Sequence, residues 1–412
     1  MHRHGSLLII FITVFIDLLG FGIVLPLLPL YGKLFAAEYG LSSTSTGWII
    51  GLLMSSFSAM QFLFAPWWGR LSDRIGRRPV LLVGLAGSAV FYTLFGLATM
   101  WKHLGLLFVS RIGAGIAGAT ISTAQAYIAD TTTKETRTKG MALIGAAFGL
   151  GFTFGPLFGY LAVPTGTGDP GPGPGYAAAA LSLAAFILAI FWLPESLSAE
   201  SEHAARRLVD FSSLREALGT PSIGPLLLTN FVCVFSFANF ESTMALLIKD
   251  EHGAFRFSFQ QVCLTFAFVG ITLSLVQGGI VRRLSTRVSE GALATAGAII
   301  EVLGFALLSL AATGGSTGSL LVALAVVVTG FAFITPSVNS LLSRRSNPVR
   351  QGGILGLAQS TSALARILGP LAGNRLFASG AELPLWLAAG LMCAGLLLVV
   401  MASRSGHDYA EA

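Results

Sequence analysis

The most informative stretch of the sequence is a polar, arginine-rich segment that reads Gly69-Arg70-Leu71-Ser72-Asp73-Arg74-Ile75-Gly76-Arg77-Arg78-Pro79. It lies between two apolar stretches, residues 46–68 and 79–100. Each of these is long enough to cross the roughly 30 Å hydrocarbon core of a bilayer as a helix. We therefore interpret the segment as a loop at a membrane surface that connects two transmembrane helices.

The composition agrees with a protein whose main solvent is lipid. Of the 412 residues, 54% are hydrophobic and only 11% are charged, and the mean hydropathy is +0.77. Soluble domains carry about 25% charged residues. The 49 glycines fit as well, because small residues let membrane helices approach closely. A soluble globular protein is therefore excluded. The net charge of +6 does not indicate nucleic-acid binding, since the basic residues lie between apolar stretches.

Twelve apolar stretches of about 20 residues or more follow one another along the chain. The first is too long for the apolar core of a signal peptide and has no small-residue cleavage site, so we expect a transmembrane helix there. The sequence thus predicts an all-α membrane protein with twelve transmembrane helices. Their approximate ranges are 7–31, 46–68, 79–100, 104–129, 139–163, 175–194, 223–248, 259–281, 289–312, 317–343, 352–377 and 383–402.

The basic residues predict an orientation. Between the spans and at the termini, 18 of the 25 lysines and arginines fall on one side of the predicted membrane. The opposite side carries only Lys33, Lys102, Lys249, Arg256 and Arg375. Loops rich in lysine and arginine stay in the cytoplasm, so we expect both termini there, in a cell (inner) membrane.

An internal repeat divides the spans into two sets of six. The fifth span contains Gly155-Pro156-Leu157-Phe158-Gly159, and the eleventh contains Gly369-Pro370-Leu371-Ala372-Gly373, 214 residues later. The sequence therefore predicts two pseudo-symmetric six-helix bundles, residues 1–194 and 223–412, joined by a mixed-charge cytoplasmic linker, 195–222. In transporters built this way the substrate site lies near the bilayer midplane, between the repeats.

Residues 69–79 resemble the signature cytoplasmic motif of the major facilitator superfamily, G-x-L-S-D-R-x-G-R-R-P, at every fixed position. The resemblance implies a cytoplasmic gate that latches the two halves in the outward-facing state. In it, Asp73 would sit at the positive N-terminal end of the eleventh helix. Arg74 or Arg77 would pair with Asp130. The predicted gate residues are Gly69, Asp73, Arg74, Gly76, Arg77, Arg78 and Asp130.

Three further segments resemble the twelve-helix drug:proton antiporters of this superfamily, including the tetracycline efflux pumps. They are Asp17-Leu18-Leu19-Gly20-Phe21-Gly22, Arg111-Ile112-Gly113-Ala114-Gly115 and the antiporter-like motif of the fifth span, Gly151, Gly155, Pro156 and Gly159. That motif ends in Tyr160, where glycine is usual in the antiporters. Its alternative reading is close helix packing through small residues.

Five ionisable residues lie within the predicted spans: Asp17, Arg111, Glu241, Glu301 and Arg366. Such residues are rare in bilayers and usually functional. We predict that Asp17 and Glu241, one in each half, include the proton-coupling carboxylate, with Arg111 as the partner of Asp17. The alternative is a static buried ion pair. The sequence assigns no role to Glu301.

Neutral polar side chains within the spans predict where a substrate would bind. An apolar cavity that contains a small number of polar groups suits an amphiphilic ligand. The candidates for this cavity are Gln61, Gln125, Asn239, Phe240, Gln277, Asn339, Gln359 and Arg366.

These features predict a secondary transporter, most simply one that exports a small amphiphilic or drug-like molecule in exchange for protons. A proton symporter or uniporter for a sugar or an organic anion stays open, because Leu193-Pro194-Glu195-Ser196 also occurs among sugar porters. The six histidines lie outside the spans and form no catalytic cluster, so we do not expect an enzyme. We also expect no cofactor, no metal and no nucleic-acid partner, and a monomer in the lipid bilayer.

Overall fold

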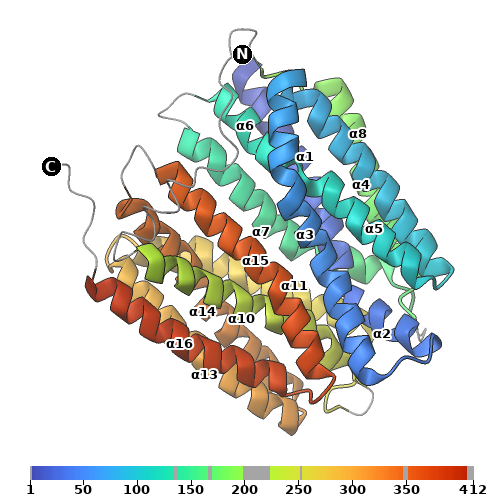
Figure 1. Cartoon of the computed structure of the whole chain (residues 1–412), viewed down its shortest axis with the longest axis vertical. Coiled ribbons are helices and arrows are strands. Elements are labelled where there is room, and N and C mark those ends of the chain that lie inside the picture. Colours follow the sequence, from blue (N-terminus) through green and yellow to red (C-terminus); the bar gives the residue numbers. More distant parts are fainter. Residues whose placement is uncertain are drawn as a thin grey trace. The chain divides into compact units, whose positions relative to one another are not determined.

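The computed structural model describes residues 2–132, 137–165, 169–197, 223–250, 253–346 and 351–405. All regular secondary structure in these ranges is helical (Figure 1). Of the predicted linker 195–222, only residues 195–197 are described, so the rest of that prediction lies outside the described residues. Within the described chain, ten helical stretches are long and apolar enough to cross a membrane.

Each of the twelve predicted spans coincides with helix in the structure. Nine of them are single helices: α3 (Ser43–Ile75), α4 (Arg77–Met100), α7 (Arg137–Ala162), α8 (Gly173–Trp192), α10 (Ile223–Lys249), α13 (Glu290–Gly314), α14 (Thr317–Arg344), α15 (Gln351–Phe377) and α16 (Leu383–Ser405). The all-α membrane architecture predicted from the sequence is confirmed.

The other three spans are interrupted. The first consists of α1 (His2–Val24) and α2 (Leu28–Glu38), because Pro26 and Pro29 lack the backbone N–H that a continuous helix needs. The fourth consists of α5 (Leu104–Ala117), the short 3₁₀ helix η1 (Gly118–Thr120) and α6 (Ile121–Thr131). The eighth consists of α11 (Phe259–Leu275), the π-helix η3 (Val276–Val281) and α12 (Arg282–Leu284).

The arginine-rich motif is mostly helical, and its interpretation as a loop was wrong. Helix α3 continues through the motif to Ile75, and α4 begins two residues later at Arg77. The single residue between them, Gly76, has φ of 103°, a left-handed conformation that favours glycine. Pro79 lies in the first turn of α4, where the missing N–H is tolerated.

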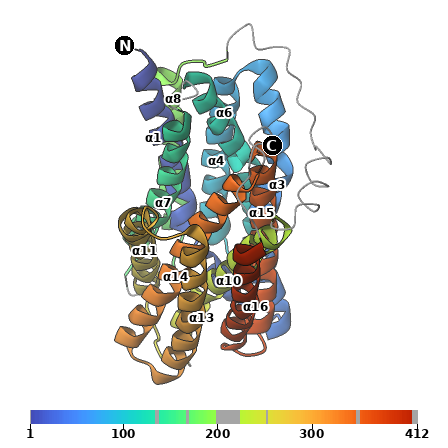
Figure 2. The same ribbon diagram turned by 90° about the vertical axis from the view of Figure 1, so that its left-hand side faces the viewer.

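Backbone contacts divide the chain into two compact units. Unit 1 comprises Met1–Leu41, Ser56–Arg206 and Ser258–Gly270. Within it α1 packs on α7 and α8, and α4 packs on α5 and α8, as Figure 2 also shows. Its core contains Ile10, Leu85, Tyr127, Ile128 and Ala147.

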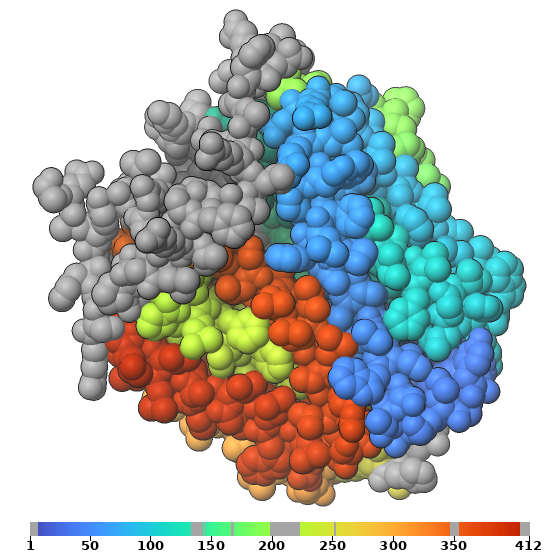
Figure 3. All heavy atoms as spheres, viewed as in Figure 1, coloured from blue at the N-terminus to red at the C-terminus, as the bar shows by residue number. Residues whose placement is uncertain are grey.

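Unit 2 comprises Ser42–Ser55, Arg207–Phe257 and Ile271–Ala412. In it α13 packs on α14 and α16, and α10 packs on α15 and α16. The first part of α3, up to Ser55, also belongs here: the Ser55 hydroxyl donates to the Ile367 carbonyl of α15 over 2.5 Å, and this part of α3 lies beside α15 on the face in Figure 3. The division of the chain into 1–194 and 223–412 stays a prediction. The units differ from it by the segments Ser42–Ser55 and Ser258–Gly270.

The repeated Gly-Pro motif makes equivalent helix contacts in both units. In unit 1 a Cβ added to Gly155 of α7 would lie 2.6 Å from Gly22 of α1. In unit 2 a Cβ on Gly369 of α15 would lie 3.0 Å from the Phe235 carbonyl of α10. Because side chains cannot fit at these distances, the glycines allow two helix backbones to touch.

Candidate functional site

The predicted gate residues form a cluster around Arg77, at the start of α4. Its guanidinium donates from Nη1 to Asp73 (2.5 Å) and to the Ser72 hydroxyl (2.7 Å), and from Nε to Asp130 (3.0 Å). Of the two candidates for pairing with Asp130, the structure therefore selects Arg77, which is buried, whereas Arg74 is exposed. Gly69 lies in the last two turns of α3, on the same helix as Asp73.

A residue outside the predicted gate completes this cluster. Glu195, just after α8, accepts hydrogen bonds from the backbone N–H groups of Arg77 (2.9 Å) and Arg78 (3.1 Å). The Arg78 side chain returns to α8 by donating to the Ile190 carbonyl over 2.6 Å. Glu195 is thus the N-terminal cap of α4, a place where the helix dipole favours an anion. The sequence signal was Leu193-Pro194-Glu195-Ser196, which had been read only as a resemblance to sugar porters.

Asp17 and Arg111 lie in unit 1, and Tyr92 of α4 interacts with both. Arg111 and the Asp17 carboxylate both interact electrostatically with the Tyr92 hydroxyl. Ser88, one turn before Tyr92, interacts with Asp17. Among the described residues, no ion pair within 4 Å joins Asp17 to Arg111, and the role of Arg111 as the partner of Asp17 stays a prediction.

Arg111 itself is 1% exposed and is surrounded by aromatic rings. Its guanidinium carbon lies 4.7 Å from the ring centre of Phe57 and 5.7 Å from that of Phe21. Cation–π attraction of this kind stabilises a charge that has lost its water. The sequence analysis missed Ser88, Tyr92 and Phe57. The i, i+4 spacing of Ser88 and Tyr92 in an apolar span was the signal that could have found the first two.

In unit 2, Glu241 of α10 and Arg366 of α15 interact electrostatically. They are not among the ion pairs within 4 Å in the described chain. Arg366 is exposed, whereas its neighbour Ala365 is fully buried. Each unit thus holds an arginine and at least one carboxylate within its apolar helices, and unit 2 holds a second carboxylate, Glu301.

Glu301 of α13 is fully buried in unit 2. Its Oε2 accepts a hydrogen bond from the Cys233 thiol of α10 over 3.9 Å, and its Oε1 has no hydrogen-bond partner within the described residues. A Cβ on Gly330 of α14 would lie 2.5 Å from the Glu301 backbone nitrogen, so α13 and α14 are in direct backbone contact here.

The predicted cavity residues have several different surroundings. Gln61 donates to the Gly118 carbonyl over 3.1 Å, and Gln125 and Gln359 are exposed on their helices. Gln277 and Asn339 line one cavity of about 490 Å³ within unit 2. Gln277 lies on the π-helix η3.

Asn239 and Phe240 are placed differently from what the cavity prediction implies, because both are buried in the packing of unit 2. Asn239 is fully buried and donates to the Pro384 carbonyl over 2.7 Å, which ties α10 to the start of α16. Phe240 is 1% exposed and packs edge-on against Phe305.

The glycines of the antiporter-like motif all face α1. A Cβ on Gly151 would lie 2.9 Å from that of Leu18, and one on Gly159 would lie 3.2 Å from the Ile23 carbonyl. Pro156 follows Gly155 inside α7. In the structure this motif therefore forms the α1–α7 contact.

Comparison with known proteins decides the family. A family model described as Major Facilitator Superfamily matches residues 10–370, most of the chain. The chain belongs to the major facilitator superfamily. Members of this superfamily are transporters, so the protein is a multi-pass membrane transporter and not an enzyme.

Two groups of superfamily members are similar to this chain over nearly its whole length. Tetracycline resistance protein, class C, of Escherichia coli is 32% identical over 383 residues, covering 93% of this chain and 92% of that protein. Major facilitator superfamily domain-containing protein 10 of Mus musculus is 29% identical over 431 residues, covering 94% of this chain and 88% of that protein.

Solved structures agree with this assignment. The crystal structure of the human organic anion transporter MFSD10 has a TM-score of 0.69 and 26% identity, and covers 97% of this chain and 100% of that chain. A D-xylose-proton symporter has a TM-score of 0.75 at 16% identity, with 97% of each chain covered. The second likeness shows the major facilitator fold alone.

Proposed function

We propose that this chain is a secondary active transporter that exports a small amphiphilic or drug-like molecule in exchange for protons, by alternating access. The observation that carries the proposal is the pair of membrane carboxylates, Asp17 in unit 1 and Glu241 in unit 2. Neither forms an ion pair within 4 Å in the described chain. A carboxylate with a distant cation can change its protonation when its surroundings change, whereas a tight ion pair holds its charge.

The surroundings of Asp17 suit proton exchange. Asp17 lines a cavity of about 20 Å³ together with Thr13 and Thr120. A space of this size holds about one water molecule when polar groups surround it. The buried Thr13 hydroxyl has no hydrogen-bond partner within the described residues, so a water here would satisfy it and contact Asp17. We infer that such a water carries the proton to or from Asp17.

The proposed substrate class rests on two observations. The aromatic rings of Phe21 and Phe57 lie beside Arg111, and such mixed apolar and polar surroundings suit an amphiphilic ligand. Several similar superfamily members are tetracycline resistance proteins, of classes B, C and D among others. We therefore propose drug-like amphiphiles as the first ligands to test.

A second candidate function is transport of an organic anion by symport or uniport. The exposed Arg366 in the middle of α15 favours it, because an accessible arginine within a membrane protein attracts an anionic ligand. The similarity to the human organic anion transporter points the same way. Sugars stay a weaker alternative within the same fold.

The remaining parts of the proposal concern the orientation of the protein in the membrane, its gate and its oligomeric state. We propose that both termini are cytoplasmic, that the cluster around Arg77 acts as the cytoplasmic gate, and that the protein works as a monomer. The charge asymmetry of the loops supports the orientation. The burial of Arg77 among Ser72, Asp73 and Asp130 supports a gate held by charge.

Proton flux in proteoliposomes tests the proposal. Purified protein is reconstituted with a pH-sensitive dye inside, without a gradient, and tetracycline-like amphiphiles, organic anions and sugars are added one at a time. We expect amphiphiles to drive protons in the opposite direction. Asp17→Asn or Glu241→Gln should abolish this exchange, because the amide cannot bind a proton.

The outcomes separate the candidates. Movement of protons together with an organic anion would establish the second function, and saturable flux without protons would establish a uniporter. If Asp17→Asn and Glu241→Gln both retained proton-driven exchange, the coupling role of these two carboxylates would be wrong. Counterflow of labelled substrate distinguishes all of these carriers from a pore.

A further inference from the structure

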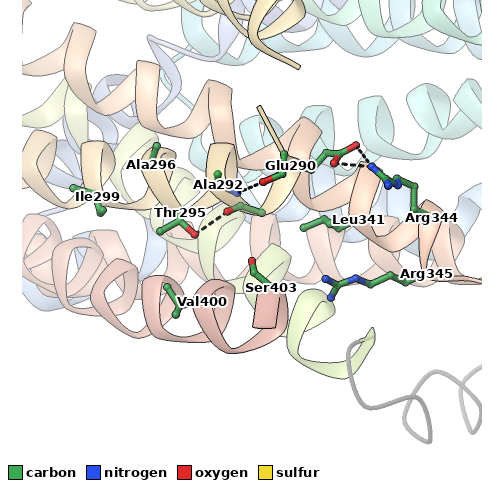
Figure 4. Close-up of a pocket in the computed structure, with 12 residues that line it drawn as sticks. Glu290, Ala292, Thr295, Ala296, Ile299, Leu341, Arg344, Arg345, Val400 and Ser403 are labelled. Carbon is green, nitrogen blue, oxygen red and sulfur yellow. Dashed lines mark hydrogen bonds and ion pairs between the residues drawn. The ribbon is translucent and has the colours of Figure 1, made fainter. Parts of the chain in front are cut away.

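A cavity at one end of unit 2 has no part in the proposed transport cycle. It has a volume of about 630 Å³ and lies among the start of α13, the end of α14 and the end of α16 (Figure 4). This volume is within the roughly 300–1,000 Å³ typical of small-molecule sites. Because α13 begins where α14 and α16 end, the cavity lies at a membrane surface, on the side of the basic loops.

Basic residues outnumber acidic ones among the described residues that line the cavity. Arg344 and Arg345 are basic and Glu290 is acidic. The Arg344 Nη1 donates to both oxygens of Glu290, at 2.9 and 2.8 Å, and its side chain is half exposed. Figure 4 shows Arg344 reaching Glu290 while Arg345 extends toward Ser403.

Arg345 is held in place by the neighbouring helix. It is 7% exposed, and its Nη1 donates to the Ala402 carbonyl near the end of α16 over 2.7 Å. A guanidinium fixed in this way is suited to planar, bidentate recognition of a phosphate. The first turn of α13 also lines the cavity, and its helix dipole favours an anion there.

The wall of the cavity continues from this rim along the apolar surface of the helices. Ala292, Ala296 and Ile299 follow one another along α13, and Val400 faces them from α16. Ile299 is 45% exposed. A polar, cationic rim followed by an apolar groove matches a ligand with a charged head and a hydrocarbon tail.

We propose that this cavity binds one anionic phospholipid from the leaflet on the basic side of the membrane. Arg344 and Arg345 contact its phosphate, and an acyl chain lies along Ala296 and Ile299. Basic pockets between membrane helices are the known chemistry of such sites. A soluble phosphate would gain nothing from the apolar wall, so we assign the site to the lipid.

Native mass spectrometry of the detergent-purified protein tests the proposal by counting bound phosphatidylglycerol. We expect one tightly retained lipid on the unmodified protein. Arg344→Gln should weaken its binding about fivefold, since one arginine near an anionic lipid surface is worth about 1 kcal/mol. The matched control is Arg283→Gln, which removes an exposed arginine on the same side of the membrane and outside the cavity.

A second pair of variants tests the groove without changing charge. Ala296→Trp should fill the groove and displace the lipid, whereas Leu303→Trp, on an exposed position of the same helix, should leave retention unchanged. Thermal stability in phosphatidylglycerol nanodiscs, compared with phosphatidylcholine, shows whether each variant is folded and whether the anionic lipid stabilises it.

Three outcomes would overturn the proposal. The first is equal lipid retention by the unmodified protein, Arg344→Gln and Ala296→Trp. The second is displacement of the lipid by millimolar inorganic phosphate or glycerol phosphate, which would make the site a soluble-anion site. The third is increased lipid binding after truncation following Ser405, which would mean that the chain's own end occupies the cavity.

Discussion

Arg111 is a permanent cation in the interior of a membrane protein, where an arginine costs about 2.5–3.5 kcal/mol or more. Its surroundings offset that cost in two ways. The Phe21 and Phe57 rings supply cation–π attraction, and the Tyr92 hydroxyl interacts electrostatically with the guanidinium. Tyr92 also interacts electrostatically with Asp17.

Replacement of this hydroxyl gives a prediction at the scale of one atom. Tyr92→Phe keeps the ring and removes the hydroxyl that interacts with both Arg111 and Asp17. We expect proton-driven transport to fall about tenfold, equivalent to about 1.4 kcal/mol, while expression and thermal stability change little. Transport assays in proteoliposomes measure this, and unchanged proton coupling in Tyr92→Phe would argue against a role for the hydroxyl.

Glu195 provides a second prediction, on stability. Its two oxygens accept from two backbone N–H groups at the start of α4. Glu195→Gln removes the charge and one of the two acceptors, so we expect a loss of about 1 kcal/mol, seen as a lower Tm of the purified protein. Glu382→Gln is a suitable control, because Glu382 lies just before α16 in unit 2 and the same change of charge is made outside α4. An equal change in both variants would contradict the capping role.

At the scale of helices, α1 and α7 are in direct backbone contact in unit 1. Gly155→Ala would place a methyl group 2.6 Å from the Gly22 backbone, so the two helices would have to separate. We expect a destabilisation of about 1–3 kcal/mol, as for other overpacked sites, together with loss of transport. Thermal unfolding of the detergent-solubilised variant measures the first effect.

The matched control for this prediction is Gly390→Ala on α16. A Cβ at Gly390 meets nothing within 4 Å, so the change should be neutral or stabilising by up to about 1 kcal/mol. If Gly155→Ala behaved like Gly390→Ala, the α1–α7 contact would not be as close as described.

The positions of the helices were predictable from the sequence, but the points at which helices end or are interrupted were harder to predict. Long apolar stretches identify spans such as 223–248 because hydrocarbon forces each span to satisfy its own backbone hydrogen bonds. The helical end of α3 was missed because residues 69–75 are polar, and polarity alone does not distinguish a surface loop from a helix that extends beyond the membrane. The interruption of α11 by η3 depends on tertiary packing and leaves no pattern in composition.

The sequence was sufficient to predict the charged residues of the candidate site, but not the side chains that interact with them. Asp17, Arg111, Glu241 and Arg366 were found because a charge in an apolar span is conspicuous. Tyr92 and Ser88 were missed because a tyrosine or serine in a membrane helix is ordinary. The burial of Asn239 against α16 could not be read from its own helix, since which face of α10 is covered is decided by other helices.

At the scale of the whole molecule, the distribution of basic residues predicts its sidedness. Single cysteines can test this after Cys393, an exposed cysteine, is replaced by serine. In cells, Thr286→Cys, beside the basic end of α12, should be protected from a membrane-impermeant thiol reagent. Ser316→Cys, at the opposite end of α13, should be labelled. The reverse pattern would invert the proposed orientation.

The π-helix η3 has a consequence for the ancestry of the chain. A single π-turn accommodates one residue more than an α-helix of the same length, so it is the structure that insertion of one codon into an uninterrupted helix would produce. Since each residue turns an α-helix by about 100°, loss of that codon would rotate every side chain beyond Val281 to a new direction. When homologous sequences are aligned with this chain, those that lack the extra residue should therefore show a gap of one position within residues 276–281, the segment that contains Gln277.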